Sequence, residues 1–226
     1  MKVLSIFITL IIFNFAYTQE LTSFYFGEAQ PATIENSLQF DSSICGKYVL
    51  EEDSLTQLYI TPDSIYTQQN VLFVLTKKDF RKSKKKYYVE ENKLYGIVDG
   101  KGLPCIVEND TTFAIYKQIS NYFTPSSTTP LKKQNKTYYL NEQNEHGYYS
   151  TSLLYHFGKG IAIYSLDHEL VMPEVRQFNQ LDSLELDNFK TYIATPTLKD
   201  MNTFVQQKGF KDVVIFFESK YYIQQD

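Results

Sequence analysis

Between Gly46 and Lys117 the sequence alternates apolar and polar residues in short segments, and turn residues separate these segments at near-regular spacing. Alternation with a period of two is typical of strands that bury one face. The dipeptides Asp99-Gly100 and Asn109-Asp110 favour tight reversals between such strands. The stretch therefore predicts an antiparallel β-meander whose last two hairpins turn at these dipeptides.

One part of the meander departs from simple alternation. Val71–Leu75 is a continuous apolar run, which is typical of a strand covered on both faces or of a buried helical turn. Directly after it, Thr76 precedes Asp79 by the spacing of a capping box, so we expect one helical turn here.

The number of strands in the meander approaches the eight of an up-and-down barrel, and the layout resembles that of lipocalin-like small β-modules. Strands of roughly five residues are too short to close such a barrel around a ligand. We therefore expect an α+β protein, predominantly antiparallel β, with an open and strongly curled meander. A smaller sheet with one or two short helices follows it.

The second half contains the clearest helix signal of the chain. Thr197 and Asp200 repeat the capping pattern, and Gly209 is a typical residue at which a helix ends. Apolar residues share one face between these points, namely Leu198, Met201, Phe204 and Val205. Upstream, the glycines around Lys159 predict a hairpin.

Changes in composition along the chain suggest five segments. We expect a signal peptide at 1–18, an irregular N-terminal arm at 19–40, the meander unit at 41–120, a linker rich in Pro, Ser and Thr at 121–136, and a small α+β unit at 137–226.

The N-terminus has the pattern of a secretory signal. Met1-Lys2 supplies a positive start, Val3–Phe15 is almost wholly apolar, and small residues precede a cleavage point that we place after Thr18. The apolar core is short for a membrane span, so we expect no transmembrane helix in the mature chain, although an uncleaved anchor is the alternative. We expect a periplasmic or extracellular location, and the bias toward Asn, Lys, Ile and Tyr favours a bacterial host.

Export changes the meaning of Cys45 and Cys105, the chain's two cysteines. In an oxidising compartment such a pair is a disulfide candidate. The alternative is two buried thiols that act as small apolar side chains.

Charge gives little support for nucleic acid as a partner. The formal charge is −4 and the pI about 5.5, so no broad attraction for phosphate backbones exists. A basic run between residues 77 and 86, followed by Tyr87-Tyr88, is the exception. We interpret it as a solvated connector, since charge runs are usually exposed.

The sequence contains no nucleophile elbow, P-loop, dinucleotide fingerprint or zinc-protease motif. We therefore assign no catalytic residue, and we expect no cofactor. The one group with metal-ligand residue types consists of His146, His156, His168, Asp167 and Glu169. Their spacings do not match those of zinc sites, so we treat them as weak candidates and ordinary histidines as the better interpretation.

Three functional hypotheses remain. The first is an exported, non-catalytic binding or interaction protein whose partner is an unknown protein or small molecule. The second is a carrier that holds an apolar small molecule on a concave sheet face, lined by Leu58, Ile60, Ile65, Tyr95, Ile97 and Phe113. The third is a metal-dependent hydrolase that uses the region of His146, His156 and His168.

Overall fold

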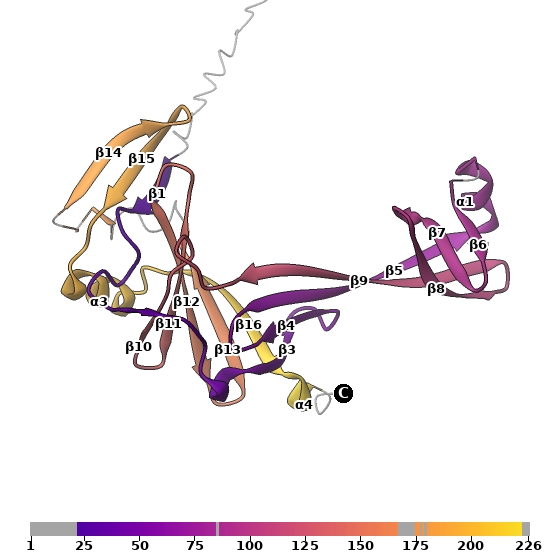
Figure 1. Cartoon of the computed structure of the whole chain (residues 1–226), viewed down its shortest axis with the longest axis horizontal. Helices are drawn as coiled ribbons and strands as arrows, with labels where there is room; N and C mark the ends of the chain where they lie inside the picture. The colour runs from indigo at the N-terminus through magenta and orange to yellow at the C-terminus, as the bar shows by residue number, and fades with distance from the viewer. Residues whose placement is uncertain (1–21, 85, 167–174, 177, 179, 223–226) are drawn as a thin grey trace, which may run out of the picture.

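The chain folds into a body and a long projecting arm (Figure 1). The structure, a computed structural model, describes residues 22–84, 86–166, 175–176, 178 and 180–222. Antiparallel β-strands dominate both parts, and the sheet stays open. The predicted class, a β-rich α+β protein with an open sheet, is therefore confirmed.

The elements divide between the two parts as follows. The body contains β1 (Thr22–Phe26), β2 (Asn36–Ser37), η1 (Ser42–Ile44), β3 (Gly46–Leu50), β4 (Thr56–Ile60), β10 (Leu131–Gln134), β11 (Thr137–Gln143), β12 (Tyr149–Phe157), β13 (Gly160–Ser165), β14 (Leu181–Leu186), β15 (Phe189–Ala194), α3 (Leu198–Gln206), β16 (Asp212–Glu218) and α4 (Ser219–Tyr222). The arm contains β5 (Ile65–Thr76), α1 (Lys77–Lys82), β6 (Tyr88–Glu90), β7 (Lys93–Val98), β8 (Lys101–Glu108) and β9 (Thr111–Phe123).

Hydrogen bonds connect these strands in the order β14-β15-β1-β12-β13-β16-β3-β4-β5-β9-β8-β7-β6. β11 pairs with β12 beside this path, and β10 joins β11 to β2. Among the described strands, β1 and β15 form the parallel pair, and the other pairs are antiparallel. Because β16 pairs with β3, the expected meander unit and the expected C-terminal unit share one continuous sheet.

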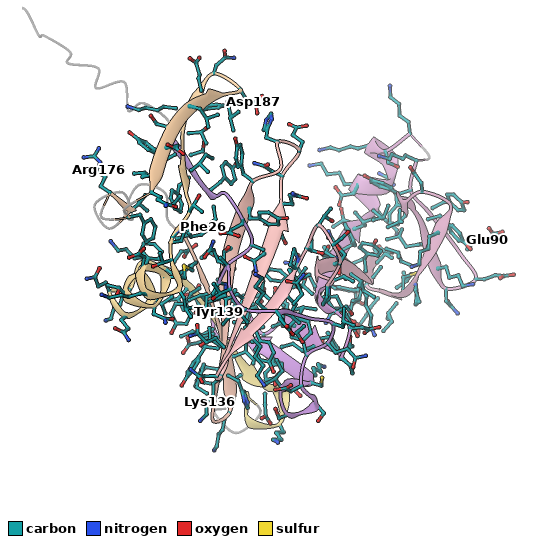
Figure 2. All side chains as sticks on the ribbon, turned by 60° about the vertical axis from the view of Figure 1, so that its left-hand side comes forward. Phe26, Glu90, Lys136, Tyr139, Arg176 and Asp187 are labelled. Carbon is teal, nitrogen blue, oxygen red and sulfur yellow. The ribbon has the colours of Figure 1, made fainter. Side chains whose placement is uncertain are left out.

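The body sheet is buried on both faces, and alternate residues of its strands enter two different cores. On β12, Leu154 belongs to one core and Leu153 to the other. The first core also contains Ile60, Ile65, Phe123 and Phe216. The second lies under α3 and includes Phe24, Phe26, Met201 and Phe204. Figure 2 shows Phe26 and Tyr139, both members of this second core, inside the body.

A polar cluster is buried between these layers. Asn141 of β11 accepts hydrogen bonds from the backbone N–H of Gln30, at 2.7 Å, and from the hydroxyl of Thr151, at 2.8 Å. Its amide donates to the carbonyl oxygens of Gln30 and Pro130, at 2.9 and 3.0 Å. Nearby, the buried ammonium of Lys132 donates to the carbonyl oxygen of Pro31 at 2.8 Å, and burial lowers the pKa of this lysine. The cluster fixes the N-terminal segment against β10 and β11.

Local sequence signals account for several elements. The capping boxes of α1 and α3 form as predicted, with Thr197 and Asp200 bonded reciprocally at the start of α3. The predicted hairpins also form, β7–β8 at Gly100, β8–β9 at Asn109 and β12–β13 beside Lys159.

Two strands of the arm are longer than those that we expected for the meander. β5 has 12 residues and β9 has 13, in place of strands of about five. β5 begins and β9 ends in the body core, where Ile65 pairs with Phe123. From there the two strands extend away from the body as a ribbon of about 40 Å. At its end they join β6, β7, β8 and α1 in a distal module around the buried Leu94, Leu103 and Ala114.

Two segments expected to be irregular are structured. Residues 19–40 were expected to form an irregular arm, but β1 inserts between β12 and β15 and buries Phe24 and Phe26 completely. The expected linker at 121–136 contains the end of β9 and all of β10, where Leu131 is fully buried. Apolar side chains reach a core in both segments, and their burial offsets the entropy of ordering the chain. The predicted signal peptide at 1–18 lies outside the described residues.

Candidate functional site

A row of exposed apolar side chains lies on one face of the arm, and we call it the apolar arm face. It consists of Leu72 and Val74 of β5, Ile106 of β8, and Phe113 and Ile115 of β9. In the strand register, Leu72 pairs with Ile115. Phe113 pairs with Val74 on one side and with Ile106 on the other. Each of these residues is between 37% and 70% exposed.

The opposite face of the same strands is covered. Phe73 and Leu75 alternate with the exposed residues of β5 and pack against the distal core around Leu94, as does Phe80 of α1. The apolar run Val71–Leu75 was interpreted as a strand covered on both faces or as a helical turn. It is a strand covered on one face, because the distal module supplies a second layer on that side alone among the described residues.

Polar residues bound the apolar arm face at both ends. Toward the body, Lys117 pairs with Asn70, and the exposed Ile119 lies beyond Lys117 on the same face. Toward the tip, Glu108 pairs with Thr111. These charged side chains are exposed and lie on the same face as Phe113, because paired residues and alternate residues of a strand share a face. The arm face thus has an apolar centre with a base at one end and an acid at the other.

The basic run of the sequence lies elsewhere on the arm. α1 carries Lys77, Lys78, Arg81 and Lys82, and its Phe80 packs into the covered core, which places the helix on the covered side. Lys77 forms an exposed ion pair with Asp110, with 2.6 Å between Nζ and Oδ1. These residues do not border the apolar arm face.

The disulfide candidate is not formed. Cys45 and Cys105 are both free thiols, and burial raises the pKa of each. Cys45 lies in the body next to β3, whereas Cys105 lies on β8 in the distal module. The sequence gives no sign that the β5–β9 ribbon carries the second cysteine away from the first, and that is why pairing by compartment alone was wrong.

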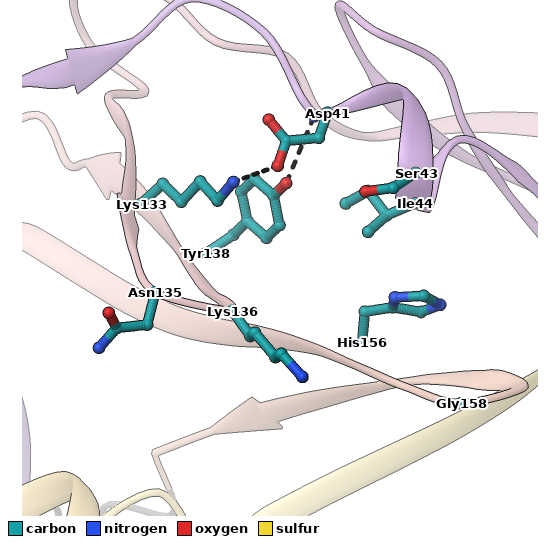
Figure 3. A pocket seen from close by; sticks show the side chains of 9 residues that line it. All are labelled: Asp41, Ser43, Ile44, Lys133, Asn135, Lys136, Tyr138, His156 and Gly158. Carbon is teal, nitrogen blue, oxygen red and sulfur yellow. Dashed lines mark hydrogen bonds and ion pairs between the residues drawn. The ribbon is translucent and has the colours of Figure 1, made fainter.

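The body contains a pocket between η1, the β10–β11 hairpin and the end of β12 (Figure 3). Its volume is about 380 Å³. Lys133 forms an ion pair with Asp41, and the Asp41 backbone N–H donates to the Tyr138 hydroxyl at 3.3 Å. The hydrogen bonds from Lys133 and Tyr138 hold the pKa of the Asp41 carboxyl below its usual range. Lys136 also lines this pocket, beside the Lys133–Asp41 ion pair.

His156, a weak metal candidate, lies in the wall of this pocket. Its Nε2 is buried, and none of the described residues forms a hydrogen bond with it. Ser43 also lines the pocket, yet no hydrogen bond joins its hydroxyl to His156 among the described residues. The pocket therefore lacks the bonded nucleophile and base that acyl transfer uses.

His146, the second candidate, lies in the turn before β12. Its Nε2 is 3.2 Å from Oδ2 of Asp187 and 3.9 Å from Oε1 of Glu145. Ligand atoms of all three exposed residues lie within 4.8 Å of one another. Asp187 was not found from the sequence, because it comes from the β14–β15 turn, remote along the chain.

The structure does not bring the histidine candidates together. The length of β12 separates His146 from His156 by about 20 Å. His168, Asp167 and Glu169 lie outside the described residues.

The residues proposed for an apolar carrier also separate. Leu58, Ile60 and Ile65 fill the first body core, and Tyr95 and Ile97 belong to the distal module. Phe113 lies on the apolar arm face. They line no common cavity in the part of the chain that the structure describes.

No helix among the described residues is long and apolar enough to cross a bilayer. Comparison with protein-family models, with curated proteins and with solved structures gave no match.

Proposed function

We propose that this chain is an exported, non-catalytic interaction protein that binds its partner through the apolar arm face. The observation that carries the proposal is the contiguous exposure of five apolar residues on the paired strands β5, β8 and β9. Contiguous exposed apolar patches with a polar border are typical of interaction surfaces.

The shape of the molecule supports the same proposal. The β5–β9 ribbon carries the patch away from the body (Figure 1), so a partner can reach it without contact with the body. Twelve consecutive residues of β5 pair with β9, which makes the ribbon a defined platform rather than a loop. Figure 2 places Glu90, in the distal module, far from Lys136 in the body.

Export is the part of the proposal that rests on residues 1–18. N-terminal sequencing of protein recovered from outside the cytoplasm tests it. We expect the mature chain to begin at Gln19, whereas an intact Met1 would overturn the export step.

Site-directed photo-crosslinking in the producing cells tests the binding surface. A photoreactive amino acid replaces Ile115 in one variant. In a control variant it replaces Gln118, which is exposed on the same strand and faces the other way. We expect a crosslinked adduct of higher mass from the first variant and none from the second. Equal yields, or no adduct at Ile115, would contradict the proposal.

A further inference from the structure

We propose that the partner of the apolar arm face is a second copy of this chain, bound face to face and antiparallel. This inference rests on the proposed function and adds the identity of the partner. The centre of the face carries no charge, since its members are Leu72, Val74, Ile106, Phe113 and Ile115. An uncharged sheet face fits another copy of itself, because two such faces pack as the layers of a β-sandwich without burying a charge.

The charges at the two ends determine the orientation of the pair. Glu108 lies at the level of Thr111, and Lys117 lies on the same face toward the body. Measured along β9, Glu108 lies about 10 Å from Ala114 toward the tip, and Lys117 lies about 10 Å from Ala114 toward the body. A twofold axis that crosses the strands at Ala114 therefore brings Glu108 of one copy to the level of Lys117 of the other, at both ends of the contact.

The alternative twofold axis, parallel to the strands, gives the opposite result. It places Glu108 opposite the same residue of the second copy, and Lys117 likewise. Like charges in apposition disfavour an interface, whereas opposite charges at the border select a partner and its register. The antiparallel arrangement is the one that pairs acid with base twice.

The length of the ribbon leaves room for the antiparallel pair. From Ala114 toward the body, β9 continues to Phe123, about 30 Å away. From Ala114 toward the tip, the strand ends at Thr111, about 10 Å away. The tip of each copy therefore ends well before the body of the other. From their exposed fractions, the five side chains expose roughly 450 Å² per copy. This is about half of the roughly 800 Å² per partner of a standard interface, so residues around them must supply the rest of the contact.

An anionic lipid surface fits these observations less well. Residues 65–123 contain more Lys and Arg than Asp and Glu, although the whole chain has a formal charge of −4. The basic helix α1, however, is on the covered side of the arm. A membrane-binding face needs its basic residues beside its apolar ones. Of the described bases, Lys117 borders the five apolar residues, and Lys93 of β7 pairs with Pro104 on the same face.

Sedimentation of the purified mature protein over a range of concentrations tests the dimer. We expect a monomer–dimer equilibrium whose dissociation constant rises at least 100-fold in Ile115→Glu, because that variant buries a charge in the contact. Lys117→Glu and Glu108→Lys each weaken the dimer about 10-fold. The double variant restores it, since it rebuilds both ion pairs with their signs exchanged.

Matched controls separate this effect from net charge and from folding. Lys82→Glu on α1, which lies on the covered side of the arm, and Glu35→Lys in the body make the same changes of charge at exposed positions away from the apolar arm face. They leave the dissociation constant unchanged. All replaced positions are exposed, so at a concentration at which the unchanged protein is monomeric we expect every variant to unfold at the same temperature as that protein.

The outcomes distinguish the two proposals. A monomer at all concentrations, or a double variant that fails to recover, overturns the second copy as partner. If the Ile115 photoprobe then yields an adduct with another protein, the proposed function stands without the dimer. If it yields no adduct, both proposals are wrong. Binding of phosphatidylglycerol vesicles that is lost in Ile115→Glu overturns the dimer in favour of a lipid surface.

Discussion

The body and the arm are built from the same strand pattern, but they differ in how many faces of the sheet are covered. On β12 of the body, Leu153 and Leu154 enter different cores and both are buried. On β5 of the arm, Phe73 enters the distal core, whereas Leu72 is 56% exposed. Alternation thus defines two faces of a strand, and a second layer from elsewhere in the chain decides whether both are buried.

The two parts also differ in the size and chemistry of their interiors. The body buries two large apolar clusters and a polar cluster centred on Asn141. The distal module has three fully buried apolar residues, Leu94, Leu103 and Ala114, with partly buried neighbours. A small core supplies little stabilisation. We therefore infer that the distal module opens at a lower free energy than the body.

The strongest test of this difference compares the same truncation in each part. Leu154→Ala and Leu94→Ala both remove a side chain that is fully buried. The first lowers the free energy of global unfolding by about 2–5 kcal/mol. The second opens the distal module and leaves the body transition unchanged. Amide hydrogen exchange and calorimetry measure the two effects, and an equal fall of the body transition in both variants would show that arm and body unfold as one unit.

The next largest effect concerns the buried polar cluster of the body, centred on Asn141. Asn141→Leu leaves the backbone N–H and carbonyl of Gln30 without their partner. Because an unpaired buried polar group is costly, we expect the free energy of unfolding to fall by about 2–3 kcal/mol. Urea denaturation measures this fall in the free energy of unfolding, and we expect the dependence of that free energy on urea concentration to stay unchanged. Asn202→Leu on α3 is the control, and a change as large there would refute a special role for the cluster.

Local signals predicted local structure well. The hairpins at Gly100 and Asn109 and the start of α3 at Thr197 depend on turn and cap chemistry between near neighbours, and all of them form. The β-rich class follows from the alternation. These features need no knowledge of distant contacts. The open sheet is also found, but the premise from which it was inferred, strands of about five residues, does not hold for β5 and β9.

Distant contacts account for what the sequence did not predict. β1 is a strand because β12 and β15, more than a hundred residues away, provide edges for it. The arm face was missed because Val71–Leu75 has the same composition as a strand with two covered faces. The one usable signal was that successive residues of β5 and of β9 are apolar, so that each strand has apolar side chains on both of its faces. Asp187 and His146 were not paired from the sequence, because they lie in two different turns, 41 residues apart, that only the fold brings together.

The smallest expected effect is a pH dependence of the free energy of unfolding that arises from the buried Tyr48 of the body core. Tyr48 is 2% exposed, and its hydroxyl donates to the carbonyl oxygen of Ile44 at 2.8 Å. Burial, with a smaller contribution from the charge of Glu218, raises the pKa of Tyr48 to about 12. Since this pKa exceeds the usual value of about 10 in the unfolded chain, ionisation favours unfolding. The stabilisation is complete below about pH 10 and is lost as the pH rises toward 12.

Tyr48→Phe therefore has two consequences. Near neutral pH it costs about 1 kcal/mol, because the Ile44 carbonyl loses its donor. In alkaline solution the variant loses stability less steeply with pH than the unchanged protein, because the ionisable group is gone. Urea denaturation on both sides of pH 10 measures the two slopes, with Tyr155→Phe as a control at an exposed tyrosine. If the stability of Tyr48→Phe and that of the unchanged protein fall equally steeply above pH 10, the body core does not keep Tyr48 neutral. The proposed difference between a closely packed body and an exposed arm face would then lose this support.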